Sequence, residues 1–106
     1  MLFRSTMVEF VEEAGCEPVQ VTNVTEAVEI LEVRTDIRTV FTDLDMQGST
    51  AGMNFALAIR DRWPPLEILM ISSIPYAEKH LPKRGVLVGK PFDQRRIVAA
   101  LRKLAA

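Results

Sequence analysis

Residues 37–43 have the sequence IRTVFTD. β-Branched and aromatic side chains dominate it, and it ends in an aspartate, Asp43. Side chains of these types favour β-structure, and a short, nearly continuous apolar run is typical of a strand buried on both faces. The stretch therefore predicts a buried strand with a carboxylate at its end.

Helical and strand-like segments alternate on both sides of this strand. In chain order we expect a helix over 2–14, a strand over 18–22, a helix after Asn23, a loop over 47–52, a helix over 55–63, a strand over 66–71, a short helix over 76–81, a strand over 86–88 and a last helix capped by Asp93. Alternation of this kind favours an α/β fold, in which helices cover both faces of a parallel sheet.

The composition bounds the class of protein. The chain has 106 residues, which suits a single domain over 1–106, and its hydrophobic fraction of 48% is enough for a core. The net charge is -1, and the basic residues are scattered, so we expect neither nucleic acid nor a membrane as partner. A lone Cys16 and the lack of a signal-peptide pattern are typical of a cytoplasmic protein.

Three polar residues directly follow three of the expected strands: Asp43, Ser72 and Lys90. Because ligands of open parallel sheets bind beyond the carboxyl ends of the strands, we expect these side chains to converge. A carboxylate, a hydroxyl and an ammonium suit phosphoryl transfer. Asp43 is the candidate nucleophile, while Ser72 and Lys90 can each bind a phosphoryl oxygen.

The motifs around these residues resemble those of response regulator receiver domains, similar to the chemotaxis regulators. The run FTDLDMQG at 41–48 resembles the segment around the family's phosphoacceptor, although Gln47 replaces its usual proline. Ser72 falls at the family's Thr/Ser position, and Lys90-Pro91 resembles its Lys-Pro signature, whose peptide bond is typically cis. The resemblance covers essentially the whole chain.

The resemblance implies a flavodoxin-like doubly wound parallel sheet, with strand order 2-1-3-4-5 but lacking the first strand. It implies a phosphoacceptor at Asp43, a hydroxyl switch at Ser72 and a phosphoryl-sensing Lys90. It also implies Mg²⁺ held by Asp43, the backbone carbonyl of Asp45 and an acidic pair after the first strand. That pair would precede Met1, so we expect weak or absent Mg²⁺ binding to this sequence.

The absent central strand has a physical consequence. Its buried side chains and ladder hydrogen bonds would contribute stabilisation of the order of a small domain's whole stability, roughly 5–15 kcal/mol. We therefore expect either that the neighbouring strands close the gap or that a second copy covers the exposed strand edges as a homodimer.

The function implied by the resemblance is that of a phosphoacceptor in a two-component phosphorelay, not that of an enzyme. Its partners would be a sensor histidine kinase or phosphotransfer protein and a separate downstream effector protein. Two alternatives stay open. One is a pseudo-receiver that binds a partner without phosphorylation. The other is a haloacid-dehalogenase-like phosphohydrolase, in which Asp45 would act as acid/base beside Asp43.

Overall fold

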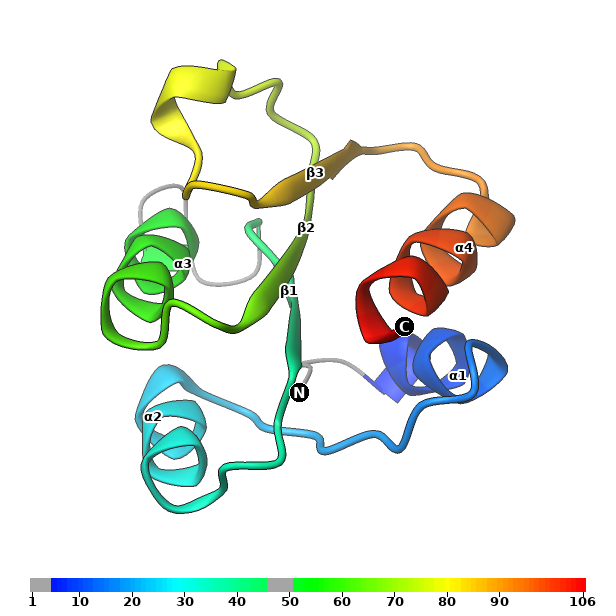
Figure 1. Cartoon of the computed structure of the whole chain (residues 1–106). Coiled ribbons are helices and arrows are strands. Elements are labelled where there is room, and N and C mark those ends of the chain that lie inside the picture. The colour runs from blue at the N-terminus through cyan, green and yellow to red at the C-terminus, as the bar shows by residue number, and fades with distance from the viewer. Residues whose placement is uncertain (1–4, 46–50) are drawn as a thin grey trace.

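The structure is a computed structural model that describes residues 5–45 and 51–106. From α2 onward, helices and strands alternate as expected from the sequence, whereas α1 and α2 follow each other without a strand between them (Figure 1). The elements are α1 (Ser5–Glu13), α2 (Val24–Val33), β1 (Thr39–Asp43), α3 (Ala51–Arg62), β2 (Glu67–Ser72), the 3₁₀ helix η1 (Glu78–His80), β3 (Val86–Gly89) and α4 (Gln94–Ala105).

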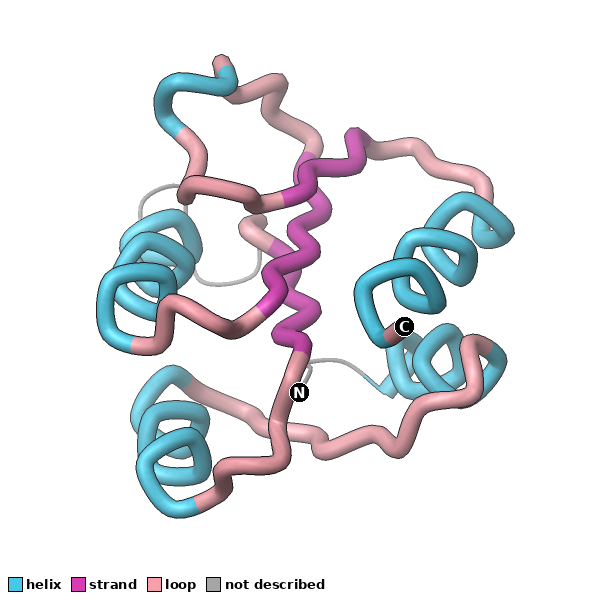
Figure 2. Tube along the Cα trace, in the orientation of Figure 1, coloured by secondary structure: helices cyan, strands magenta, loops and turns pink. Residues whose placement is uncertain are grey.

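The three strands form a parallel sheet in the order β1-β2-β3 (Figure 2). In the register, Phe41 pairs with Leu69, and Leu69 pairs with Val86. The expected parallel sheet is thus confirmed, and its strands correspond to the last three of the predicted order. Parallel pairing brings the carboxyl ends of all three strands to one edge of the sheet.

Helices cover both faces of the sheet, with α2 and α3 on one side and α1 and α4 on the other (Figure 1). Successive residues of a strand point to opposite faces, so Val40 packs in the core under α2 and α3, while Phe41 packs in the core under α1 and α4. β2 alternates in the same way. Because both faces are covered, the middle of β1 and of β2 carries buried apolar side chains on both faces, and the polar residues lie mainly toward the strand ends.

Two expected elements are wrong in extent. The expected strand over 18–22 is reduced to a single bridge residue, Gln20. Its alternating pattern suits a strand, but a strand forms only against a neighbour, and none of the three described strands pairs with this segment. The expected loop over 47–52 also differs, because α3 already begins at Ala51. Residues 46–50 and 2–4 lie outside the described residues.

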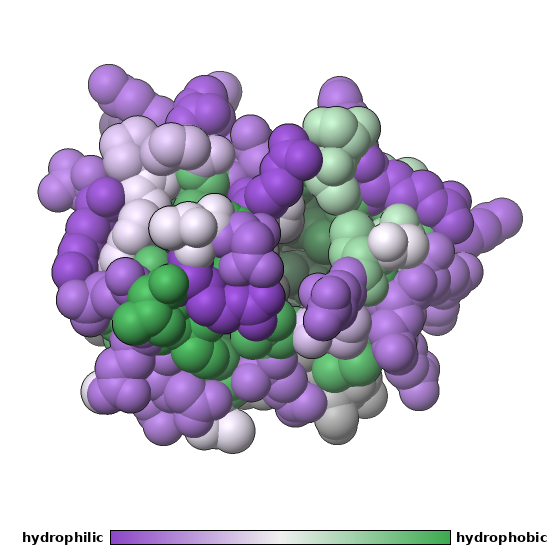
Figure 3. Space-filling view, turned by 60° about the horizontal axis from the view of Figure 1, so that its bottom comes forward, coloured by the Kyte–Doolittle hydropathy of each residue, from purple (hydrophilic) through white to green (hydrophobic). Residues whose placement is uncertain are grey.

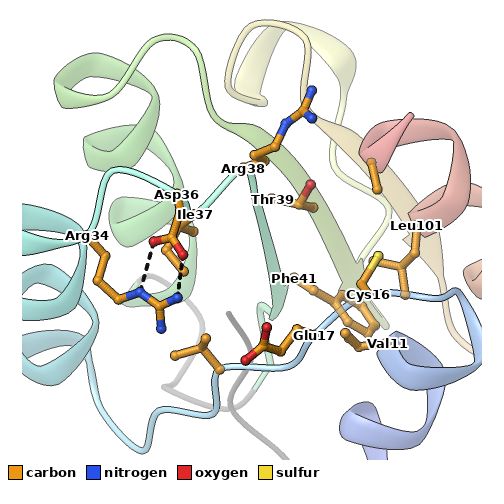
Figure 4. Close-up of a pocket in the computed structure, with 12 residues that line it drawn as sticks. Val11, Cys16, Glu17, Arg34, Asp36, Ile37, Arg38, Thr39, Phe41 and Leu101 are labelled. Atoms are coloured by element: carbon orange, nitrogen blue, oxygen red, sulfur yellow. Dashed lines mark hydrogen bonds and ion pairs between the residues drawn. The ribbon is translucent and has the colours of Figure 1, made fainter.

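A cavity of about 220 Å³ lies beside β1 (Figure 4). Figure 3 shows a hollow with an apolar floor on this side of the molecule. The described residues that line the cavity are Val11, Cys16, Glu17, Val19, Arg34, Asp36, Ile37, Arg38, Thr39, Phe41, Leu101 and Ala105. Residues of β1 and of the segment around Val19 both line the cavity, and among the described residues no fourth strand joins the sheet.

Candidate functional site

Asp43 is the last residue of β1, and its side chain is fully buried. Its carboxylate oxygens have different partners. Oδ1 accepts a hydrogen bond of 2.9 Å from the backbone N–H of Asp45, and Oδ2 accepts one of 2.8 Å from Nζ of Lys90. A buried carboxylate is costly unless it is hydrogen-bonded and paired with a cation. Lys90 therefore compensates for the burial of the Asp43 charge.

The ends of β2 and β3 place the other two predicted residues. Ser72 is the last residue of β2 and is itself buried, and Lys90 directly follows β3. The backbone N–H of Lys90 donates to the carbonyl oxygen of Ser72 over 2.8 Å, which holds these two chain segments together. The Lys90–Pro91 peptide bond is cis. The structure thus brings Asp43, Ser72 and Lys90 to one edge of the sheet.

The carboxylate of Asp45 was not predicted to take part as a side chain in the receiver-like site, but it lies at the centre of it. Oδ1 accepts a hydrogen bond from Oγ of Ser72 (3.1 Å), and Oδ2 accepts one from the backbone N–H of Ser73 (2.9 Å). Nζ of Lys90 lies 3.1 Å from the same Oδ2. Ser73, another unpredicted residue, thus joins the site through its backbone. The only sequence signal was the Asp-Leu-Asp spacing of residues 43–45.

The electrostatics of the site follow from these contacts. Partial burial alone would raise the pKa of Asp45, but the hydrogen bonds from Ser73, Lys90 and Ser72 outweigh it and lower the pKa to about 2. Burial acts to lower the pKa of Lys90, but the two carboxylates raise it above its ordinary value of 10.5. At neutral pH the site therefore contains an anionic Asp45 beside a cationic Lys90.

The lowered pKa of Asp45 predicts that the stability of the protein depends on pH in the acid range. Because folding lowers the pKa of Asp45, its stabilising contribution is present above its unfolded pKa of about 4 and is lost as the pH falls toward about 2. We expect the free energy of unfolding to fall less between about pH 5 and about pH 2 in Asp45→Asn than in the wild type. Urea unfolding at both pH values measures the difference. An equal fall in both proteins would contradict the role given to Asp45.

The geometry of the strand ends agrees with the family comparison. The sequence matches the response regulator receiver domain family over residues 1–102. The chain belongs to this family. Receiver domains are signalling regulators of two-component systems rather than classical enzymes, and the parallel sheet with helices on both faces is the flavodoxin-like fold expected of them. Among curated proteins, none matches the sequence.

Solved receiver structures share the fold. A response regulator from Thermotoga maritima is 22% identical, with 98% of this chain and 93% of that chain covered and a TM-score of 0.73. A receiver domain protein from Clostridium thermocellum is 18% identical, with coverages of 97% and 89% and a TM-score of 0.76. NtrX from Brucella abortus is 20% identical with a TM-score of 0.72, and this receiver domain covers 24% of that chain. At these identities the likeness concerns the fold alone.

Receiver domains typically bind Mg²⁺ at the phosphorylation site, but the side chains described here do not form a magnesium site. Among the described residues, no group of three or more His, Cys, Asp or Glu side chains could hold a metal ion. Asp43 and Asp45, the two carboxylates at the strand ends, both contact Lys90 instead. Mg²⁺ usually keeps several waters and is bound through one or two carboxylates, but here the ammonium of Lys90 pairs with both carboxylates, so the described side chains fit the ion poorly. No helix within the described ranges is long and apolar enough to cross a bilayer.

Proposed function

We propose that the chain acts as a phosphoacceptor receiver domain that is phosphorylated on Asp43. The observation that carries the proposal is the contact of 2.8 Å between Nζ of Lys90 and the buried carboxylate of Asp43, with Ser72 at the end of the next strand. A carboxylate nucleophile and neighbouring donors for phosphoryl oxygens are the groups that phosphoryl transfer to an aspartate needs.

The chemical step is a substitution at phosphorus. One oxygen of the Asp43 carboxylate forms the new bond to phosphorus, and the bond between phosphorus and the donor's leaving group breaks, so that acetyl phosphate would release acetate. The added phosphoryl oxygens then accept hydrogen bonds from Lys90, which contacts Asp43, and from Ser72, which follows the residue that pairs with Asp43 on β2. The product is an acyl phosphate at the end of β1.

The proposed partners follow from this chemistry. A sensor histidine kinase or a phosphotransfer protein would supply the phosphoryl group, and a separate effector protein would respond to it. We place this exchange in the cytoplasm. Within the described residues the outer strands β1 and β3 each pair with β2 alone, so their outer edges are where a homodimer would form.

The test is the intact mass of the chain after incubation with acetyl phosphate, with Mg²⁺ present and absent, beside Asp43→Asn. The wild type is expected to gain one phosphoryl group and the variant none, because the amide that replaces the carboxylate is not a nucleophile. Asparagine keeps the shape of the side chain, so folding is retained. Equal gain in both proteins would exclude Asp43 as the acceptor, and no gain in either would exclude phosphorylation by this donor.

The second candidate function is that of a pseudo-receiver, which binds its partner without phosphorylation. The side chain of Asp43 is fully buried, and its partner Lys90 is shared with a second carboxylate, Asp45. Both carboxylates are therefore already paired with a cation in the absence of a phosphoryl group. Failure of the acetyl phosphate experiment in the wild type would favour this function.

No observation favours the phosphohydrolase alternative. In that mechanism Asp45 would have to exchange a proton at neutral pH, and a group does this best when its pKa is close to the working pH. The contacts around Asp45 lower its pKa to about 2 instead. Its carboxylate is therefore suited to accepting hydrogen bonds as an anion and unsuited to acting as a general acid.

A further inference from the structure

Three donors from two segments converge on the carboxylate of Asp45. They are a hydroxyl, a backbone amide and an ammonium: Oγ of Ser72, N–H of Ser73 and Nζ of Lys90, at 3.1, 2.9 and 3.1 Å. Both carboxylate oxygens are used. Donors of these three kinds, gathered at the ends of neighbouring strands, are the groups that bind an oxoanion.

The hydroxyl of Ser72 is held in the orientation needed to donate a hydrogen bond to an oxoanion. Its oxygen accepts a hydrogen bond of 3.0 Å from the backbone N–H of Ile74, so the hydroxyl hydrogen is free to point at Oδ1 of Asp45. Ser72 is 1% exposed, which shields this hydrogen bond from water. The orientation is therefore set by the local turn, and Asp45 uses donors that are already in place.

We propose that the Asp45 carboxylate is an internal anion that occupies the oxoanion-binding position formed by Ser72, Ser73 and Lys90. It thereby competes with any external oxoanion for the same donors. This inference rests on the proposed function, because it concerns the same site. A phosphoryl group that forms on Asp43 must displace Asp45 before it can use these donors. The Asp45 carboxylate thus inhibits binding of a phosphoryl group at these donors.

The tether makes this competition effective. Asp45 lies two residues after Asp43, so its carboxylate is present at the donors at an effective concentration of the order of millimolar or more. A free anion must exceed this concentration to compete. Removal of the Asp45 charge leaves the Ser72 hydroxyl and the Ser73 amide without this acceptor, and it leaves Lys90 paired with Asp43 alone. Each charge-assisted hydrogen bond regained by a free anion contributes about a tenfold change in affinity.

The experiment is a titration with inorganic phosphate, followed in amide NMR spectra at the N–H of Ser73. We expect Asp45→Ala to bind phosphate at least about tenfold more tightly than the wild type, with a shift of the Ser73 signal. Asp45→Asn is the second variant, because it nearly preserves the shape of the side chain should the alanine variant fail to fold. Asp43→Asn removes one negative charge from the same site while Asp45 remains in place, so we expect no comparable gain.

Asp61 provides a control at a distance. It is an exposed carboxylate on α3, so Asp61→Asn changes the net charge equally and is expected to leave phosphate binding unchanged. Equal phosphate affinity in the wild type and the Asp45 variants would overturn the proposal, and so would an equal gain in Asp43→Asn. Phosphate binding does not require phosphorylation. If acetyl phosphate modifies none of these proteins while Asp45→Ala binds phosphate more tightly, the proposed phosphorylation fails and the internal anion stands.

Discussion

Lys90→Met is expected to lower the free energy of unfolding by about 3 kcal/mol, and also to prevent stable phosphorylation. Lys90 is the cation that lies 2.8 Å from the buried Asp43 and 3.1 Å from Asp45. Removal of one partner of a buried ion pair leaves an uncompensated charge, which costs about 3–5 kcal/mol. We expect the lower end of this range because 27% of the Lys90 side chain is exposed. Urea unfolding measures the loss.

A double-mutant cycle tests whether the loss of unfolding free energy comes from the carboxylates that are left without their cation. In Asp43→Asn the loss on adding Lys90→Met is expected to be smaller than in the wild type, because only Asp45 is then left without its cation. Lys103→Met is the matched control, since Lys103 is exposed on α4 and its replacement should change stability by no more than about 0.5 kcal/mol. Strictly additive effects of the two site substitutions would contradict the assigned coupling.

Phe41→Ala is the second large change, and it concerns the fold. Phe41 is 1% exposed on β1 and packs in the core under α1 and α4. Truncation of a buried phenylalanine to alanine removes apolar contacts and leaves a cavity, which costs about 3–5 kcal/mol. This is a large part of the roughly 5–15 kcal/mol that stabilises a small domain. Thermal unfolding followed by circular dichroism is expected to show a strongly lowered Tm or no folded state.

Val33→Ala provides the comparison for this truncation. Val33 is 78% exposed near the end of α2, so its truncation removes little packing, and alanine is the better helix former. We expect its free energy of unfolding to stay within about 0.5 kcal/mol of the wild type. Similar effects of the two substitutions would mean that Phe41 is not part of a packed core.

The parts of the fold that could be predicted are those whose signal lies within one segment. The run that ends at Asp43 is apolar and β-branched, so it indicates a buried strand whatever surrounds it. The segment 18–22 shows where such reasoning stops. Its alternation suits a strand, but strand formation depends on a partner, and here it yields only the bridge at Gln20.

The candidate site divides in the same way. Asp43, Ser72 and Lys90 could be placed together because each directly follows a strand, and parallel strands end at one edge. The role of the Asp45 carboxylate could not be predicted. The direction of the Asp45 side chain depends on which donors at the ends of β2 and β3 lie within its reach. These donors come together only when the sheet has assembled.

Phosphorylation on Asp43 is tested by locating the phosphoryl group within the chain. After treatment with acetyl phosphate, borohydride reduces an aspartyl phosphate to homoserine, and peptide mass spectrometry then identifies the changed residue. We expect homoserine at position 43, with Asp45 unchanged. Homoserine at position 45, or at any other aspartate while Asp43 stays intact, would contradict it.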